Sequence, residues 1–351
     1  MGAKYSKLRF EEFAKAAALG AIAGAVALQP VAAKAATGSV EIHAGNATWF
    51  VNTNITFSTT SSGGLAFSEA TLHANTASQS DTHNTSTRHD AFDGALTWHV
   101  NAGVPGSLEN GGYQSPGGTV SVTANSVVGT TQVMAGLNVH VELYFASAKA
   151  VARSMLVLQN PTGAPITVTV DNDTNMGSDN DTTYHLTSSG DATYDASDNW
   201  TISCQPDPGH PALCLSDPVL TFAFSQTGAP VRPTAIQAVT NGSDKQYFRY
   251  TVTVPAGGTQ RLLEFVQLSD TVAHATTDAA LFNSTGTLQS SGYLAGLSPT
   301  EQAQIVNWVV NPTPVPTLSQ WALAGMAGLL GLFGLGSAGA FGRKRKRART
   351  V

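Results

Sequence analysis

The sequence predicts an all-β fold: an antiparallel β-sandwich, either one large or two smaller, with two short helices near its end and a separate C-terminal transmembrane helix. Three observations between residues 36 and 310 support this class. Apolar and polar residues alternate in short runs, as they do in antiparallel strands with one buried face. Gly, Pro, Asn and Asp separate these runs. Few segments between these runs have apolar residues at helical spacing, which disfavours parallel β/α units.

The strands follow from this alternation. In chain order we expect them at residues 48–57, 95–100, 119–123, 139–145 and 219–224. Further strands are expected on both sides of two turns, at 160–165 and 255–258, because residues that favour turns interrupt long apolar runs there. The alternation is clearest in 139–145, which places its apolar residues on one face and His140, Glu142 and Tyr144 on the other.

Two helices are expected late in this region. The first covers residues 270–282. The second begins with a capping box, because Ser298 stands at the N-cap, Pro299 follows it, and Glu301 comes three residues after the cap. Residues 305–309 then place Ile, Val and Trp at helical spacing, which predicts a continued helix whose apolar stripe packs on the core.

The N-terminal 35 residues have the organisation of a signal peptide. Basic residues Lys4, Lys7, Arg9 and Lys15 precede an apolar run over 16–28. Ala33 and Ala35 then flank Lys34 in a pattern that predicts cleavage before Ala36. This predicts export through the secretory translocon and cleavage by signal peptidase. A membrane-anchored helix is the alternative, although the run is short for a membrane span.

The C-terminus has three parts after the domain at 36–310. Residues 311–316 form a Pro-rich spacer. Residues 322–342 carry no charge, and as a helix they would extend about 31 Å, which is the thickness of a bilayer's hydrocarbon core. A basic tail follows, and the positive-inside rule places it in the cytoplasm. The tail consists of Arg343, Lys344, Arg345, Lys346, Arg347 and Arg349.

A short motif precedes the predicted membrane helix. It consists of Val315, Pro316, Thr317, Leu318 and Trp321 in the stretch VPTLSQW. Together with the helix and basic end, over residues 315–351, it resembles the IPTL-CTERM sorting domain of Gram-negative bacteria. Val315 replaces the family's isoleucine, and an alanine replaces the glycine after the tryptophan.

This resemblance implies an exported protein whose C-terminal segment is recognised by an exosortase-type transpeptidase. The protein would then reach the cell envelope, the cell surface or the extracellular matrix. The membrane contact could be transient, ending with cleavage, or the helix could remain as a permanent inner-membrane anchor.

The formal net charge of −5 averages three regions of different sign. Eleven of the 18 Lys and Arg residues lie in the two ends, whereas 21 of the 23 acidic residues lie between them, so residues 36–310 carry a net charge of −14. Such a region repels nucleic acid, which excludes nucleic-acid binding, and it attracts cations.

The two cysteines, Cys204 and Cys214, lie ten positions apart in CQPDPGHPALC. In an exported chain this spacing across a turn predicts a disulfide bond. A metal site would need additional ligands nearby, and the loop itself contains only His210.

One acidic stretch, DNDTNMGSDNDTT, is a candidate calcium site, because calcium binds carboxylate and carbonyl oxygens. Its carboxylates are Asp171, Asp173, Asp179 and Asp181. The stretch is not an EF-hand, since Met176 occupies the position that requires glycine. The alternative is a solvated acidic turn.

A second polar stretch contains Asp81, His83, Arg88, His89, Asp90 and Asp93, which could bind a metal or form solvated surface. Trp49, Trp98 and Trp200 could stack on sugars, although core packing is the simpler expectation for the first two.

No local motif of an esterase, zinc peptidase or nucleotide enzyme occurs in the sequence. We therefore expect a non-enzymatic structural or adhesive protein of the cell surface or matrix. The alternative is a secreted carbohydrate-binding or carbohydrate-active sandwich, since a pair of catalytic carboxylates cannot be recognised from sequence.

Overall fold

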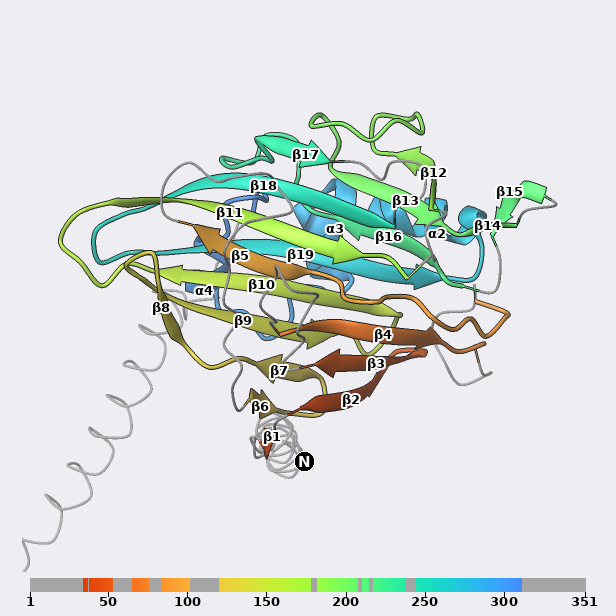
Figure 1. Ribbon diagram of the computed structural model, residues 1–351, viewed down its shortest axis with the longest axis horizontal. Helices are drawn as coiled ribbons and strands as arrows, with labels where there is room; N and C mark the ends of the chain where they lie inside the picture. Colours follow the sequence, from red (N-terminus) through yellow and green to blue (C-terminus); the bar gives the residue numbers. More distant parts are fainter. Residues whose placement is uncertain are drawn as a thin grey trace, which may run out of the picture.

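A ten-stranded antiparallel sheet forms the centre of the computed structural model (Figure 1). The structure describes residues 34–36, 38–52, 65–75, 84–101, 120–177, 182–207, 210–214, 217–237 and 244–310. The strands of the large sheet are, in spatial order, β1 (Lys34–Ala36), β6 (Val120–Val122), β7 (Ser126–Val128), β9 (Leu137–Phe145), β10 (Val151–Gln159), β19 (Thr259–Ser269), β16 (Val219–Ala223), β13 (Trp200–Cys204) and β12 (Thr183–Thr187), while β8 (Gln132–Met134) also pairs with β9.

Two smaller sheets form the second layer of the sandwich. One consists of β2 (Ser39–Ala44), β3 (Ala47–Asn52) and β4 (Ala66–Leu72). The other consists of β17 (Ala235–Gln237), β18 (Lys245–Val254), β11 (Ile166–Asn175) and β5 (Thr97–Asn101). Backbone bridges from Phe67 to Ala95 and from Leu72 to Arg88 connect β4 to the segment that leads into β5.

The two turns predicted from sequence carry the chain from one layer to the other. Residues 160–165 connect β10 of the large sheet to β11, and residues 255–258 connect β18 to β19. The alternation along β18 buries Tyr250, Val252 and Val254 between the layers, whereas β10 and β19 are buried on both faces.

One continuous apolar core lies between the layers, so the domain is one large sandwich. At one end of it Trp49, Phe67 and Phe145 meet with ring centroids 5.7–5.9 Å apart. The predicted all-β antiparallel class is confirmed. Of the two predicted arrangements, the domain has the one large sandwich.

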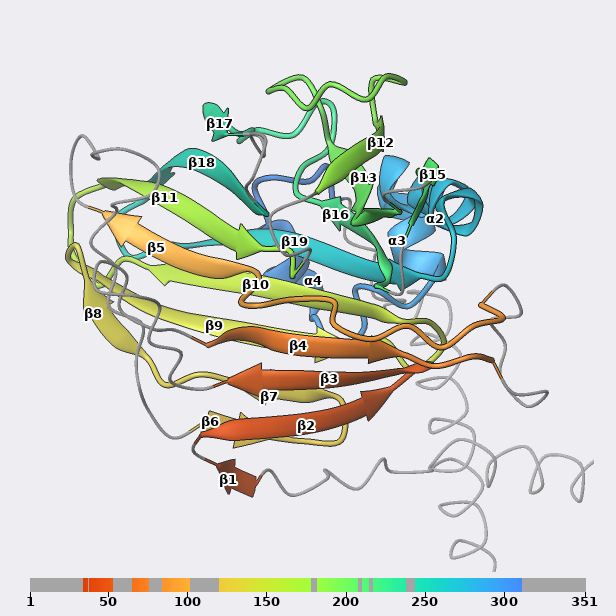
Figure 2. The same cartoon turned by 45° about the vertical axis from the view of Figure 1, so that its right-hand side comes forward.

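Helices cover the opposite face of the large sheet, as Figures 1 and 2 show in blue. They are α2 (Val272–Ala279), the 3₁₀ helix η2 (Ala280–Asn283), α3 (Thr285–Ser290) and α4 (Pro299–Ala303). A second apolar core lies beneath them, in which Phe265 of β19 packs against Phe282, Tyr293 and Trp308.

Both expected α-helices form, and each is shorter than predicted. The first begins after Thr271, whose side chain accepts a hydrogen bond from the His274 amide, and it becomes 3₁₀ at Ala280. The capping box of Ser298 and Glu301 is present. The prediction that residues 305–309 continue this helix is wrong, because α4 ends at Ala303.

The segment after α4 is instead tied to β19 by its backbone. The Arg261 amide donates to the Gln304 carbonyl at 2.8 Å, and the Val306 amide donates to the Arg261 carbonyl at 3.0 Å, which makes Ile305 a parallel partner of Arg261. β16 pairs only with the later part of β19, from Phe265 to Ser269. The segment therefore occupies an edge that β16 leaves open, and the helix stops because these backbone groups pair with the sheet.

A two-stranded hairpin, β14 (Pro206–Asp207) and β15 (His210–Cys214), projects from one end of the molecule in Figure 1. The predicted disulfide between Cys204 and Cys214 is present at the base of this hairpin, with a Cα–Cα distance of 5.8 Å.

No helix within the described residues is long and apolar enough to cross a membrane. The predicted membrane helix at 322–342 and the apolar run at 16–28 both lie outside the described residues.

Candidate functional site

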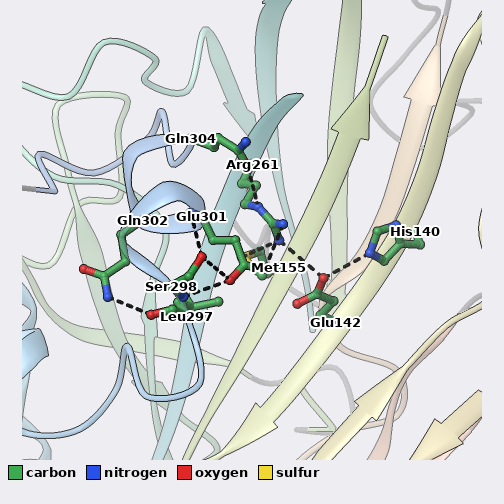
Figure 3. Close-up of polar contacts among 9 residues, drawn as sticks. All are labelled: His140, Glu142, Met155, Arg261, Leu297, Ser298, Glu301, Gln302 and Gln304. Atoms are coloured by element: carbon green, nitrogen blue, oxygen red, sulfur yellow. Dashed lines mark hydrogen bonds and ion pairs between the residues drawn. The ribbon is translucent and has the colours of Figure 1, made fainter. Parts of the chain in front are cut away.

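The strongest cluster of polar side chains lies on the helix-covered face of the large sheet, where β9, β10 and β19 meet the beginning of α4 (Figure 3). It follows from strand alternation. β9 directs Val139, Val141 and Leu143 into the sandwich core, so His140 and Glu142 point to the other face. Arg261, on β19, also points to this face. We call this cluster the Arg261 network.

Arg261 binds three side-chain oxygens with its guanidinium group, and its Nη1 also lies 3.8 Å from Met155 Sδ. Its Nη1 lies 3.3 Å from Glu142 Oε1, its Nη2 lies 3.1 Å from Glu301 Oε1, and its Nε donates to Gln304 Oε1 at 3.0 Å. The side chain is only 9% exposed. A buried guanidinium needs such partners, because an unpaired charge away from water is costly.

Glu301 has two roles in the network. Its Oε2 accepts hydrogen bonds of 2.8 Å from the amide and the hydroxyl of Ser298, which completes the capping box of α4. Its Oε1 pairs with Arg261. One carboxylate thus caps the start of α4 and also pairs with the arginine of the large sheet.

Glu142 stays ionised in this setting. Burial alone would raise its pKa, but the hydrogen bond from His140, whose Nε2 lies 3.0 Å from Oε1, and the charge of Arg261 outweigh burial and lower the pKa of Glu142 below its ordinary value. It is therefore an anion that accepts hydrogen bonds, and it is poorly suited to serve as a general acid near neutral pH.

A second arginine lies beside the network. Arg153 of β10 is 4% exposed, lies 4.7 Å above the ring of Tyr144, and donates to the carbonyls of Tyr293 and Ala295. Burial lowers its pKa to about 10, which still leaves it charged at neutral pH. Its contacts tie the loop before α4 to the sheet.

Two hollows open at this place, one lined in part by Glu142 and the other in part by Arg261 and Glu301. The first, of about 300 Å³, is lined by Tyr144, Arg153 and the loop at 295–297, among others. The second, of about 360 Å³, is lined mostly by polar side chains. These include Asn138, His140, Gln159, Thr300, Glu301 and Gln304. We call the two hollows together the α4 cleft. Amides, hydroxyls and carboxylates in such a cleft are suited to hydrogen-bond a polyhydroxylated ligand.

The candidate calcium residues lie at one end of β11. Asp171 and Asp173 belong to this strand, so the acidic stretch begins as a strand and not as the expected loop. Asp171 is buried and accepts two hydrogen bonds from Arg249, at 2.6 and 2.9 Å. Asp179 and Asp181 lie outside the described residues. Calcium binding remains a prediction, checked by a rise in melting temperature when calcium is added.

The other predicted site residues lie on the surface or outside the described residues. In the second polar stretch, Asp81 and His83 lie outside the described residues, while His89, Asp90 and Asp93 are exposed. Ala35 and Ala36 of the predicted cleavage site lie in β1, and Ala33 lies outside the described residues. The sorting motif at 315–321 and the basic tail at 343–349 are also outside them.

The three tryptophans are core residues. Trp49, Trp98 and Trp200 are 0%, 1% and 7% exposed. Trp98 donates to Ser154 inside the sandwich, and Trp200 donates to Asn283 of η2. Their proposed use as sugar-stacking surfaces is therefore wrong, whereas core packing of Trp49 and Trp98 is confirmed.

Sequence reasoning assigned no function to Arg261 or Gln304, and it treated Glu301 only as a helix cap. One signal was present. Arg261 is the first residue of the apolar run RLLEFVQL. A charged side chain beside such a run needs a partner, because an unpaired buried charge is costly. The identity of that partner depends on the return of the chain forty residues later, which no local pattern encodes.

Comparisons with known proteins add one finding at the C-terminus. Residues 313–345 match the IPTL-CTERM motif, which confirms the resemblance noted in the sequence. The motif is a sorting signal, so it indicates an exported protein of the bacterial cell envelope and implies exosortase-type processing. A comparison with curated proteins gave no match.

Solved structures give weak likenesses. A galactose mutarotase-like protein from Lactobacillus casei is 11% identical with a TM-score of 0.39, over 66% of this chain and 100% of that chain. The heparan sulfate lyase HepC from Pedobacter heparinus is 11% identical with a TM-score of 0.33, over 69% of this chain and 37% of that one. TM-scores this low do not establish a common fold, so no function follows from them.

Proposed function

We propose that this chain, which carries the IPTL-CTERM motif at residues 313–345, is a cell-surface or extracellular-matrix protein of a Gram-negative bacterium with a structural or adhesive role. The secretory translocon exports it, signal peptidase removes residues 1–35, and an exosortase-type transpeptidase processes the C-terminus at the inner membrane. The position of the motif carries the proposal, because it follows directly after a domain whose described residues end at Val310.

The Arg261 network supports a non-enzymatic role for the domain. Its charged groups are bound to one another, and Glu142 and Glu301 are both fixed by the same guanidinium. A catalytic acid or base has to exchange protons with a substrate, and carboxylates held in this way are poor candidates for that task.

The intact mass of the mature protein from its native host tests the proposal. The expected species begins at Ala36 and lacks Trp321 and everything after it. The variant Leu318→Ala should retain the tail, whereas Pro312→Ala, in the spacer outside the motif, should be processed normally. A wild-type protein that keeps its Arg-rich tail would contradict exosortase processing and would make the chain a membrane-anchored envelope protein.

Carbohydrate binding is the second candidate, and the polar lining of the α4 cleft favours it. A glycan array and a reducing-sugar assay test it. Binding should be weakened by Gln159→Ala together with Thr300→Ala, and unchanged by Thr251→Ala, which alters an exposed residue of β18 in the other layer. Turnover of a glycan would instead contradict the non-enzymatic role, and silence across a broad panel would contradict carbohydrate binding.

A further inference from the structure

Three metal-binding side chains meet at the end of the large sheet where the hairpin β14–β15 projects. His185 comes from β12, Cys204 from β13 and Cys214 from β15. His185 Nε2 lies 3.1 Å from Cys204 Sγ and 3.8 Å from Cys214 Sγ. The three ligand atoms all lie within 4.8 Å of one another. In this structure the two sulfur atoms form a disulfide bond.

The local fold places the histidine there through an irregularity in the strand pair. β12 and β13 are in register at Tyr184 and Ser203 and again at Leu186 and Ile202, so His185 is the extra residue of a β-bulge. A bulge changes the direction of a side chain and interrupts the ladder, and such irregularities often occur at functional sites. Here the bulge residue contacts the sulfur atoms.

The third side chain arrives through the hairpin. Cys214 pairs with Pro206, which lies two residues after Cys204, so the tight hairpin returns Cys214 to the starting cysteine. β12 is the edge strand of the large sheet. Cys204 is buried, while His185 and Cys214 are half-buried. The cluster is thus formed by the fold, and two of its three side chains are only partly buried.

The three side chains supply donor atoms of the kinds that zinc binds. A neutral imidazole and two thiolates form a donor set typical of zinc and related ions.

We propose that His185, Cys204 and Cys214 form a binding site for one zinc-class divalent ion when the disulfide is reduced. Reduction requires two electrons and two protons, which a thiol or phosphine reductant supplies. Metal binding then releases the two thiol protons and forms two metal–sulfur bonds and one metal–nitrogen bond. A water molecule completes the tetrahedron. At the usual bond lengths of about 2.3 Å to sulfur and about 2.0 Å to nitrogen, the ligand atoms would be about 3.5–3.8 Å apart, which is close to the present His185–Cys214 distance.

Cobalt(II) is the probe that tests this site. The full chain is reduced with a phosphine under nitrogen and titrated with cobalt(II), while absorption from thiolate-to-cobalt charge transfer and from tetrahedral ligand-field bands is recorded. One equivalent of cobalt should bind and be displaced by zinc, and the oxidised chain should give no such bands. The absence of thiolate charge transfer in the reduced chain would overturn the proposal.

Two histidine variants separate this site from adventitious binding by free thiols. His185→Ala should weaken cobalt binding at least tenfold, whereas His210→Ala, which removes the histidine within the hairpin, should leave it unchanged. Equal affinity in the His185→Ala variant would overturn the proposal, as would a loss of affinity in His210→Ala alone.

A further variant keeps the test valid if reduction unfolds the chain, which circular dichroism would reveal. Cys214→His cannot form the disulfide and retains three ligand side chains at the same place. It should bind one cobalt(II) ion without any reductant, and its melting temperature should rise with zinc. A folded Cys214→His variant that binds no cobalt would overturn the proposal.

Discussion

At the scale of single residues, buried charges determine what the domain tolerates. Arg261 of β19 binds Glu142 of β9, and it binds α4 through Glu301 and Gln304. Strand alternation predicts that His140 and Glu142 leave the core, and the capping box predicts the position of Glu301. The convergence of these residues on Arg261 could not be predicted, because it depends on contacts across 40 and 119 positions of the chain.

Replacing Arg261 with methionine should destabilise the domain by about 1–3 kcal/mol, because two partly buried carboxylates lose their partner. Arg261→Lys should cost less, since it keeps the charge but loses the fork that reaches both carboxylates. Urea denaturation measures both. Equal stability of the methionine variant and the wild type would contradict the role of Arg261 in holding α4 to the sheet.

A buried carboxyl group sets the response to pH. Glu264 of β19 is 1% exposed, and its Oε1 lies 3.0 Å from the Tyr250 hydroxyl. Burial raises the pKa of Glu264 well above its ordinary value, so the folded chain keeps this proton at a pH where the unfolded chain has released it. Stability should therefore fall as pH rises above the ordinary pKa of glutamate, by up to about 1.4 kcal/mol per pH unit from this group.

Comparison of variants isolates this contribution. In Glu264→Gln the decline in melting temperature between mildly acidic and neutral pH should become smaller, because the titrating group is gone. Glu69→Gln is the control, since Glu69 is exposed on β4 and its replacement should leave the decline unchanged. A Glu264→Gln variant with the wild-type pH profile would show that Glu264 does not titrate in this range.

At the scale of elements, alternation predicted β9 and β18, and long apolar runs beside a turn predicted β10 and β19, which are buried on both faces. β2 alternates regularly but was not among the expected strands. β12 and β13 were not predicted, because β12 is half-buried on both faces and bulged, and β13 is buried on both faces, so neither shows the period of two. The stretch after α4 has helical spacing but pairs with β19, since the open edge of the sheet offers its backbone better partners.

Asn307 shows how that stretch is fixed. Its Oδ1 accepts from the Leu263 amide at 2.9 Å, and its Nδ2 donates to the carbonyls of Leu263 and Phe224 at 2.7 and 2.8 Å. Asn307→Ala leaves the buried Leu263 amide without its acceptor, while the two carbonyls keep the donors Trp308 and Tyr250, and it should destabilise the domain by about 2 kcal/mol. Asn138→Ala, whose amide binds Gln159 at the surface, should change the stability by less than about 0.5 kcal/mol. Thermal denaturation of the two variants checks this difference.

At the scale of the whole molecule, composition predicted the class and the division into an exported domain and a sorting segment. The stacking of two smaller sheets on one large sheet, and the helices on its outer face, were not predicted. Both depend on strand pairing between distant segments, such as β5 with β11 and β1 with β6. Local sequence specifies which face of a strand is apolar, but not which strand lies beside it.

The domain should be complete at Val310 and incomplete at Ala303. A chain of residues 36–310 should melt within about 2 °C of a chain of residues 36–351, because both chains keep the same contacts among residues 36–310. A chain of residues 36–303 loses the buried Ile305, Asn307 and Trp308 and should fail to fold or melt far lower. Equal melting temperatures of the two shorter chains would contradict the structural role of the final segment.

The attachment of residues 304–308 to β19 also has a mechanical consequence. This segment runs parallel to β19 and is bound along its length through Gln304, Val306, Asn307 and Trp308. When a cell-surface protein is held at its C-terminal end, tension enters the domain at Val310. Tension directed along the strand would load these hydrogen bonds together, in shear, instead of peeling them apart one after another. With the C-terminal attachment proposed above, this segment would be the part of the domain that bears the force first.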